Sequence, residues 1–521
     1  MKKILLASAL ATALAFSAPA TDHGYTNPVI PGFHPDPSVV RVGEDYYLVN
    51  SSFQFFPGVP IFHSRDLVHW QQIGNVLDRP EQLPLTNASA WLGIYAPTIR
   101  YHDGLYYMVT TNVGNGAKGG GNFFVTAKDP AGPWSNPVWL DQGGIDPSLF
   151  WEDGKCYLVS NPDVMIKLCE IDTTTGEQLT PSVDLWQGTG GRHPEAPHIF
   201  KKDGWYYLLI AEGGTEMGHS VTIARSRDIR GPYESNPDNP ILTHLRRAAQ
   251  NNKIQGTGHA DLVQAHDGSW WMVCLAFRTQ ANNQHLTGRE TYLAPVTWNE
   301  DGWPVVNGGN PIELQMNVPT LPQHPVATAP ETYDFTTLST FPHEWVFLRN
   351  PHTENYAFTP EGLLLKGTDV TLQSLDSPTF VALRQLNPDF TASETFSVAN
   401  LQSGARAGLT VYMDTHSHYD AYVTRTDPGT YRICLSYNLH ALHKVEQSVA
   451  IPANAEITIK VVGSDDMYDF YYSLNDGDEH KLGSLNARFL STETAGGFTG
   501  ITLGMFAEGA ADVMVKNFSY K

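Results

Sequence analysis

The chain has 521 residues, a formal net charge of −21 and only 17% charged residues, together with 12 Trp, 23 Tyr, 23 Phe, 45 Gly and 35 Pro. The negative charge argues against nucleic acid or an anionic membrane as a partner, whereas a neutral polysaccharide is compatible with it. The aromatic, glycine and proline content is typical of a turn-rich all-β protein, and the length predicts two domains.

The first residues have the pattern of an export signal. Lys2 and Lys3 give a positive start, residues 4–16 are apolar, and Ala18-Pro19-Ala20 offers small residues for cleavage, after Ala20 or after Ala18. The apolar run is too short to span a bilayer, and no later stretch reaches the roughly 20 residues that a spanning helix needs. A buried first helix is the alternative. We predict a signal peptide over residues 1–20 and a periplasmic or secreted protein without membrane insertion.

A repeat occupies residues 21–313. Each of its five units has a small or acidic residue, an apolar strand, a turn and a pair of residues that is usually aromatic. The units begin at Asp36, Ala96, Asp146, Ala196 and Ala260. In four of the five the turn is Asp-Gly, a strong hairpin signal. Short antiparallel strands repeated about every 50 to 65 residues predict a five-bladed β-propeller. A β-sandwich is the competing architecture, but sandwiches do not repeat one motif five times.

Four cysteines in so long a chain are not a disulfide framework. Cys156 and Cys169 flank a turn at residues 161–163 at equal distance, so a hairpin would set them opposite each other. Two buried thiols are the favoured interpretation, and a cross-strand bridge in an oxidising compartment is the alternative. Cys274 and Cys434 are predicted to be core residues.

The repeat ends in a proline-rich segment, residues 314–332. Its prolines at 319, 322, 325 and 330 indicate a linker. From residue 333 to residue 521, short strands of alternating polarity with regularly spaced turns predict a C-terminal β-sandwich. The predicted fold is therefore all-β, a five-bladed propeller followed by a sandwich.

Three carboxylic acids are expected to meet at one mouth of the propeller. The first strand of each blade lines the axis, and Asp36, Asp146 and Glu195 lie at the start of that strand in three units. Cleaving a glycosidic bond requires an acid and a base or nucleophile with different pKa values, and a nearby third carboxylate keeps the acid protonated. Acids beside proline often form turns instead, but the repeated position favours catalysis. For Glu212, at the end of an inner strand, a structural role is favoured.

Several motifs resemble glycoside hydrolase family 43. They are GFHPDPS at 32–38, FQFFPGVPI at 53–61, GIDPSLF at 144–150, PEAPH at 194–198, AEGGT at 211–215, GHADL at 258–262 and GRET at 288–291. The resemblance extends into a C-terminal sandwich of the concanavalin/laminarinase-like type. It implies an inverting mechanism in which Asp36 is the general base, Glu195 is the general acid, and Asp146 raises the pKa of Glu195 and orients it. In an inverting pair the two carboxyls lie roughly 6.5–9.5 Å apart.

The resemblance also implies residues that bind the substrate. Arg289 would hold a sugar hydroxyl and a carboxylate together, with a salt bridge to an Asp within the blades as the alternative. Phe53 and Tyr95 would wall the pocket for the terminal sugar, and Phe498 would close it from the second domain or else be a core residue. His259 would approach a calcium ion through water or be a hydrogen-bonded structural histidine. No cofactor is required.

The resulting hypothesis is an exo-acting β-xylosidase or α-L-arabinofuranosidase that acts on xylan, arabinoxylan or oligosaccharides derived from hemicellulose. Close β-xylosidase relatives often carry Trp where this chain has Tyr95, which weakens a pure β-xylosidase assignment. An endo-arabinanase shares the propeller but needs a groove open at both sides. A carbohydrate-binding protein without catalysis would keep the aromatic residues and lose an acid, whereas all three acids are present here.

Overall fold

A computed structural model describes residues 24–114, 120–245, 252–280, 283–427 and 429–521. Over these residues the chain consists of β-strands, short 3-10 turns and one short helix, α1 (Thr492–Ala495), so the prediction of an all-β protein is confirmed. No helix in these ranges is long and apolar enough to cross a membrane. The predicted signal peptide, residues 1–20, lies outside the described residues.

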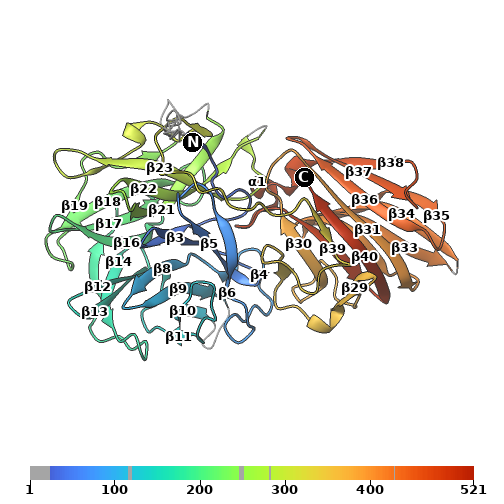
Figure 1. Cartoon of the computed structure of the whole chain (residues 1–521), viewed down its shortest axis with the longest axis horizontal. Coiled ribbons are helices and arrows are strands. Elements are labelled where there is room, and N and C mark those ends of the chain that lie inside the picture. The colour runs from blue at the N-terminus through green and yellow to red at the C-terminus, as the bar shows by residue number, and fades with distance from the viewer. Residues whose placement is uncertain (1–23, 115–119, 246–251, 281–282, 428) are drawn as a thin grey trace, which may run out of the picture.

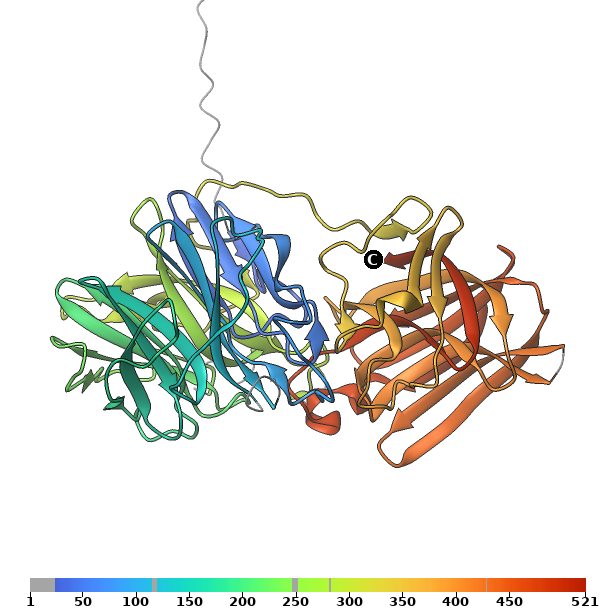
Figure 2. The ribbon, with the colours of Figure 1, turned by 90° about the horizontal axis from the view of Figure 1, so that it is seen from below.

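The molecule has two parts that lie side by side, an N-terminal part drawn in blue to yellow-green and a C-terminal part drawn in orange to red (Figures 1 and 2). The N-terminal part contains five antiparallel sheets that follow one another along the chain. Their strands, sheet by sheet, are β2 (Ser38–Val42), β3 (Asp45–Val49), β5 (Gly58–Ser64) and β6 (Gln71–Leu77); β7 (Gly93–Ile94), β8 (Thr98–His102), β9 (Leu105–Val113), β10 (Gly120–Ala127) and β11 (Val138–Trp139); β12 (Ile145–Glu152), β13 (Lys155–Asn161), β14 (Ile166–Ile171) and β15 (Val183–Trp186); β16 (Glu195–Lys202), β17 (Trp205–Glu212), β18 (Ser220–Ser226), β19 (Glu234–Ser235) and β20 (Leu242–Thr243); β21 (Ile254–Gln264), β22 (Trp270–Arg278), β23 (Glu290–Trp298) and β24 (Pro304–Val306).

One strand of each sheet contacts its counterpart in the next sheet. Contacts join β2 to β8, β8 to β12, β12 to β16, β16 to β21 and β21 back to β2. The five sheets therefore follow one another in a closed cycle. Three of the predicted Asp-Gly hairpins are two-residue turns, since Asp103, Asp153 and Asp203 have φ values of 47°, 50° and 50° and a glycine with positive φ follows each.

A buried polar network joins these five strands. The carboxylate of Asp261 on β21 accepts hydrogen bonds from Ser38 Oγ on β2 and from Arg100 Nη1 on β8, both at 2.8 Å. Arg100 Nη2 lies 3.0 Å from Nδ1 of His198 on β16, and this nitrogen lies 3.0 Å from Ser148 Oγ on β12. Burial acts to raise the pKa of Asp261, but Arg100, His198 and these hydrogen bonds lower it to about 2. A charged carboxylate therefore holds the centre of the cycle together.

The C-terminal part consists of two antiparallel sheets whose side chains share one hydrophobic core. In spatial order, the strands of one sheet are β28 (Tyr356–Thr359), β29 (Gly362–Lys366), β40 (Ala511–Tyr520), β31 (Phe390–Leu401), β36 (Glu456–Gly463), β37 (Met467–Leu474) and β38 (His480–Asn486), with β26 (Thr332–Asp334) also paired to β40. Those of the other are β30 (Thr379–Arg384), β39 (Thr502–Glu508), β32 (Arg406–Asp414), β33 (Ser417–Asp427), β34 (Thr430–Leu439) and β35 (Leu442–Ile451).

The two parts are connected by the predicted linker and by strand pairing. Near the start of the linker segment, β25 (Gln315–Met316) pairs with β1 (Tyr25–Thr26), so this end belongs to the N-terminal part. Residues 317–331, all of them described, contain no strand, and Figure 2 shows the chain crossing here between the parts. A second connection is the pairing of β4 (Phe55–Phe56) with β27 (Phe347–Leu348).

Cys156 and Cys169 are buried free thiols, as the favoured interpretation predicted, and Cys274 and Cys434 are also buried. The expectation that Cys156 and Cys169 lie opposite each other is wrong. Cys169 pairs with Leu158, and Cys156 pairs with Ile171. The hairpin is centred between residues 163 and 164, one residue beyond the midpoint of Cys156 and Cys169, and a shift of one residue in the centre moves the register by two.

A buried arginine, Arg349, ties the two parts together directly after β27. Its side chain is 1% exposed and donates hydrogen bonds to the backbone carbonyls of Ala88, Ser374 and Asp376 at 2.9, 3.1 and 2.5 Å. Its backbone N–H donates to the carbonyl of Gln54. One side chain therefore anchors a loop of the N-terminal part and a loop of the C-terminal part, with no carboxylate among these acceptors.

Replacing Arg349 with Met should lower the free energy of unfolding by about 2–4 kcal/mol, because several buried carbonyls lose their donor. Urea denaturation measures the change. Arg65→Met is the control: Arg65 pairs with Glu44 on the surface, so its loss should cost less than about 0.5 kcal/mol. Equal losses in the two variants would contradict the anchoring role.

Candidate active site

The structure brings all eight predicted site residues into one pocket. Its lining is Asp36, Asp146, Glu195, His259, Arg289, Phe53, Tyr95 and Phe498, together with Ala96, Ile145 and Thr215. Ten of these residues come from the N-terminal part, and Phe498 comes from the C-terminal part. The sequence prediction of a shared location therefore agrees with the geometry, while the chemical roles of these residues remain predictions.

A repeated backbone kink directs the carboxylates into the pocket. Asp36, Asp146 and Ala196 have φ values of 55°, 54° and 55°, and His259 has a φ of 43°. Such left-handed values are uncommon for residues other than glycine. The kink occurs in four of the five sheets, near the start of the first strand at Asp36, Asp146 and Ala196 and in the middle of β21 at His259. In the fourth sheet the kink falls on Ala196, and the acid is the preceding residue, Glu195.

Asp36 is a buried carboxylate that is held in its charged form. Its Oδ1 atom accepts a hydrogen bond from Arg289 Nη1 at 3.0 Å and lies 3.5 Å from His259 Nδ1, and its Oδ2 atom accepts from Ser51 Oγ at 2.5 Å. Burial acts to raise the pKa of Asp36, but Arg289, His259 and Ser51 together lower it below its ordinary value. An ionised carboxylate is the state that a general base requires.

Asp146 is a buried acid that is affected by the charge of Glu195. Burial raises the pKa of Asp146 well above its ordinary value, and the charges of Glu195 and Asp36 raise it further. Asp146 Oδ2 also accepts a hydrogen bond from the backbone N–H of Ala196 at 2.9 Å, so it fixes the backbone beside Glu195. The pocket thus combines one ionised carboxylate, Asp36, with one carboxyl group, Asp146, that favours its protonated form.

Arg289 connects the charged side of the pocket with its aromatic wall. Its Nη1 atom also donates to Thr215 Oγ1 at 3.1 Å, and Nη2 donates to the carbonyl of Phe498 at 3.2 Å. Its guanidinium carbon lies 5.4 Å from the centre of the Phe53 ring. The ion pair with an Asp, which was the alternative for this residue, is present, and the partner is Asp36, itself a site residue.

Three aromatic rings form the wall. The ring centres of Phe53 and Tyr95 are 5.1 Å apart, those of Phe53 and Phe498 are 5.8 Å apart, and those of Tyr95 and Phe498 are 6.2 Å apart. The Tyr95 hydroxyl donates to the carbonyl of Trp91 at 2.7 Å, and burial raises the pKa of Tyr95 to about 12. Tyr95 and Phe498 are only partly buried, so Phe498 is a pocket residue and not a core phenylalanine.

Sequence reasoning missed three residues of this region. Thr215 lines the pocket and binds Arg289. Trp91 is 47% exposed and packs edge-on against Phe498 with ring centres 4.6 Å apart. His219 is fully buried with Nε2 at 3.4 Å from Glu195 Oε1. These residues lie outside the slots of the repeat, so the periodic pattern carried no signal for them.

Glu212 has the structural role that was favoured for it. Its buried carboxylate accepts hydrogen bonds from the backbone N–H groups of Thr189 and Gly191 and from the hydroxyl of Thr222. These contacts fix the loop that leads into Glu195. Glu212 therefore stabilises the loop that precedes Glu195, and it does not line the pocket.

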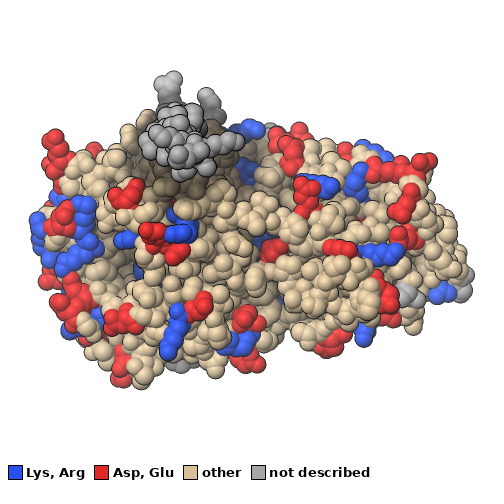
Figure 3. Space-filling view, in the orientation of Figure 1, with Lys and Arg blue, Asp and Glu red and all other residues tan. Residues whose placement is uncertain are grey.

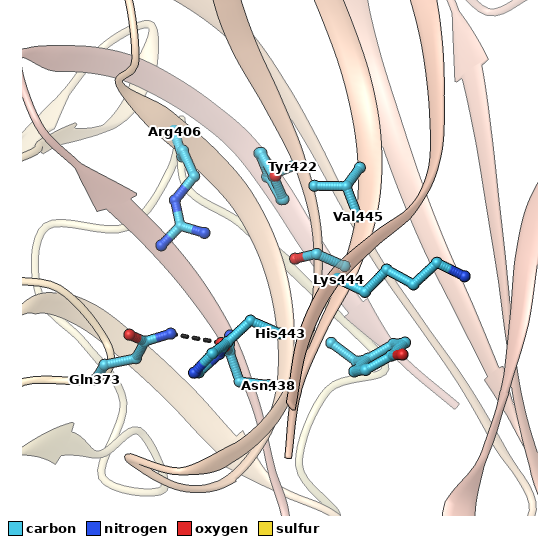
Figure 4. A pocket seen from close by; sticks show the side chains of 9 residues that line it. Gln373, Arg406, Tyr422, Asn438, His443, Lys444 and Val445 are labelled. Atoms are coloured by element: carbon cyan, nitrogen blue, oxygen red, sulfur yellow. Dashed lines mark hydrogen bonds between the residues drawn. The ribbon is translucent and has the colours of Figure 1, made fainter. Parts of the chain in front are cut away.

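Another hollow lies over β32 to β35 of the C-terminal part (Figure 4). Its labelled side chains include Arg406, Tyr422 and His443, and a hydrogen bond joins Gln373 to Asn438 at 2.5 Å. The residues that line it, all in the described part of the chain, include no Asp or Glu. This hollow therefore has no carboxylate pair for hydrolysis.

On the face shown in Figure 3, basic side chains are interspersed with acidic ones.

Comparisons with known proteins identify both parts of the chain. Residues 25–304 match the family model "Glycosyl hydrolases family 43", and residues 332–521 match "Beta xylosidase C-terminal Concanavalin A-like domain". The chain is 41% identical over 492 residues to a non-reducing end alpha-L-arabinofuranosidase of Bacteroides ovatus, covering 93% of this chain and 91% of that protein. It is 38% identical over 507 residues to a xylosidase/arabinosidase of Butyrivibrio fibrisolvens, covering 92% and 95%. A solved Bacteroides ovatus structure, described as "Xyloglucan PUL GH43B", superposes with a TM-score of 0.92 at 39% identity, covering 96% of this chain and 100% of that one.

Replacing Arg289 with Met removes the nearest cation from Asp36, so the pKa of Asp36 should rise by roughly 1–3 units. Carboxyl ¹³C NMR titration of aspartate-labelled protein measures this, with Asp36→Asn identifying the signal. Thr215→Val is the matched control, because it removes a contact of Arg289 and leaves the cation in place. An Asp36 pKa that is unchanged in Arg289→Met would contradict the electrostatic account.

Proposed function

The chain belongs to glycosyl hydrolases family 43, and from this premise we propose that it is an inverting exo-glycosidase that removes terminal β-D-xylose or α-L-arabinofuranose from xylan, arabinoxylan or oligosaccharides derived from them. The observation that carries the proposal is the pocket that an ionised Asp36 shares with Glu195 and with Asp146, whose pKa is raised.

In the proposed reaction Asp36 takes a proton from a water molecule, and the water oxygen attacks the anomeric carbon of the terminal sugar. Glu195 gives its proton to the leaving oxygen as the glycosidic bond breaks, and the product has the opposite anomeric configuration. The contact between Asp36 and Arg289 supports the first role because it favours the charged carboxylate. The raised pKa of Asp146 supports the second role because the pocket favours a protonated carboxyl group beside Glu195.

Exo action is supported by the way the two parts meet at the pocket. The Phe498 carbonyl accepts a hydrogen bond from Arg289, and its backbone N–H lies 3.4 Å from the carbonyl of Ala90. The C-terminal part therefore contributes a wall of the pocket, and an endo-arabinanase would need that side open. The choice between the two pentoses depends on the shape of the wall formed by Phe53, Tyr95 and Phe498. The relatives described above carry names of both activities.

We further propose that the five sheets are the blades of a propeller over residues 21–313, and that residues 333–521 form the sandwich after a linker at 314–332. The closed cycle of contacts from β2 to β21 and back supports five blades. The two family matches, at 25–304 and 332–521, support a division within the proposed linker.

The proposed reaction needs no cofactor, and no step is assigned to calcium. The surroundings of His259 fit a calcium ion poorly, because its ring faces Asp36, whose carboxylate already binds Arg289 and Ser51. Calcium prefers several oxygen ligands, and the described residues contain no cluster of three or more His, Cys, Asp or Glu suited to a metal. The contact found for His259 is that of its Nδ1 atom with Asp36 Oδ1 at 3.5 Å, which favours a role beside Asp36 in the pocket.

Glu195→Gln should reduce turnover of substrates with poor leaving groups by about 10²–10⁴-fold, since the acid is lost. Turnover of activated aryl glycosides, whose leaving groups need little protonation, should fall much less. Glu216→Gln, on an exposed Glu nearby that pairs with Arg192, is the control and should leave both rates within about twofold. A non-catalytic binding protein would instead keep its sugar affinity in both variants and have no turnover to lose.

Rates of the purified protein on an aryl β-xyloside and an aryl α-L-arabinofuranoside will decide which pentose is preferred. ¹H NMR of the first product should show inverted configuration at the anomeric carbon. A product with retained configuration would contradict the role of Asp36 as a general base.

We also propose export through the signal peptide. Expressed in a Gram-negative host, the protein should appear in the periplasm or medium with Thr21 as its first residue, or with Pro19 if cleavage follows Ala18. Mass spectrometry of the intact protein measures this, and an exported form that retains residues 1–18 would contradict it.

A further inference from the structure

His219, which is fully buried, has one ring nitrogen that faces Glu195. Its Nε2 atom lies 3.4 Å from Glu195 Oε1, and no hydrogen-bond partner for Nε2 is found among the described residues. The residue directly precedes β18, and its backbone N–H donates to the carbonyl of Glu216. A buried imidazole with an unpaired nitrogen beside a carboxyl group calls for a physical explanation.

The other ring nitrogen fixes the tautomer. Nδ1 lies 3.3 Å from the backbone carbonyl of Gly256, and a carbonyl only accepts hydrogen bonds. Nδ1 therefore carries the proton, and in the neutral ring Nε2 has a lone pair and can only accept. When Glu195 holds its acid proton, its hydroxyl is the donor that matches this lone pair.

The chain makes room for this ring. A Cβ atom at Gly258 on β21 would lie 2.3 Å from Nδ1 of His219 and 2.4 Å from two carbons of the ring. Since Gly258 has no left-handed φ, its backbone conformation does not demand glycine. The glycine is therefore required by the space that the imidazole occupies.

We propose that His219 is a positioning residue for Glu195, whose acid proton it accepts in a hydrogen bond from Oε1 to Nε2, so that the carboxyl group is oriented and kept in its acid form until the substrate binds. This inference rests on the proposed role of Glu195. The 3.4 Å separation then shortens in the protonated state, as contacts of catalytic groups commonly do when the reacting complex forms.

Other charged groups surround this contact. The charges of Asp36 ahead of β2, Asp146 on β12 and His259 on β21 act on His219 or Glu195, and Arg289 ahead of β23 pairs with Asp36. In the hydrogen bonds found for the described residues, none of them bonds to His219 Nε2 or to the Glu195 carboxyl group, so the effect of His219 is separable from the general electrostatics of the pocket. Removing the His219 acceptor destabilises the protonated form of Glu195. The alkaline limb of the pH–activity profile should therefore move to lower pH.

The test compares His219→Leu and His219→Gln. In His219→Leu the alkaline limb of kcat/KM should move down by about one pH unit, and kcat on poor leaving groups should fall at least about tenfold while that on activated aryl glycosides changes little. His219→Gln offers an amide oxygen as acceptor and should recover part of both effects. An alkaline limb that stays in place or moves up, or equal losses for both kinds of leaving group, would overturn the proposal.

Two further variants separate positioning from damage to the fold. His244→Gln is the matched control. His244 is a buried histidine whose Nδ1 atom lies 2.7 Å from the carbonyl of Ile254 and whose Nε2 atom accepts a hydrogen bond from the N–H of Ile312. The replacement of His244 should therefore leave the pH profile unchanged. Gly258→Ala keeps the imidazole but displaces it, and should reproduce the pH shift of His219→Leu. A Gly258→Ala profile identical to that of the unmodified protein would contradict the contact.

A readout without substrate distinguishes this proposal from the proposed function. ¹⁵N NMR of histidine-labelled protein, with the His219 signal identified by its loss in His219→Gln, should show the tautomer protonated at Nδ1. A ring protonated at Nε2 would overturn the proposal even in an active enzyme. If the ring is protonated at Nδ1 as expected but the protein cleaves neither aryl pentoside, the proposed function is overturned. The proposed catalytic role of the contact is then overturned with it.

Discussion

The ion pair between Arg289 and Asp36 is the interaction on which the rest of the site depends. Three carboxyl groups share a small pocket, and three negative charges there would repel one another strongly. Arg289 neutralises only one of them, so Asp36 remains charged, whereas burial and the charges of Glu195 and Asp36 raise the pKa of Asp146. The same guanidinium binds the carbonyl of Phe498. The side chain of Arg289 therefore both neutralises Asp36 and binds the residue of the C-terminal part that closes the pocket.

Two sets of features hold these residues in place. In the first, residues with left-handed φ kink the chain in four of the five sheets. In the second, Asp261 and Arg100 belong to a network to which each of the five sheets gives one polar side chain. Because four sheets take part in both sets and the remaining sheet takes part in the network, a shift of one sheet would disturb the site from several directions.

Much of this site could be predicted from the sequence because its main residues occupy equivalent slots of a repeat. Asp36 and Asp146 stand out where other units have Ala96 and Ala260, and a repeat that closes on itself brings such slots together. His219 could not be predicted in this way, since its partner Glu195 is reached only through the folded arrangement of β16 and β18. The pairing of β4 with β27 was equally hidden, because two-residue strands far apart in sequence leave no periodic signal. The predicted register of β13 and β14 was wrong because the centre of the hairpin lies one residue beyond the midpoint of Cys156 and Cys169.

The four cysteines lead to a practical consequence for labelling. All four are buried thiols without a disulfide, and burial raises the pKa of Cys156, Cys169 and Cys274, with that of Cys169 at about 12. Thiolates are the reactive form towards alkylating dyes, so the native chain should give almost no background. A single cysteine introduced on the exposed surface near α1 would thus be a clean attachment point for a fluorophore that reports on the interface between the two parts.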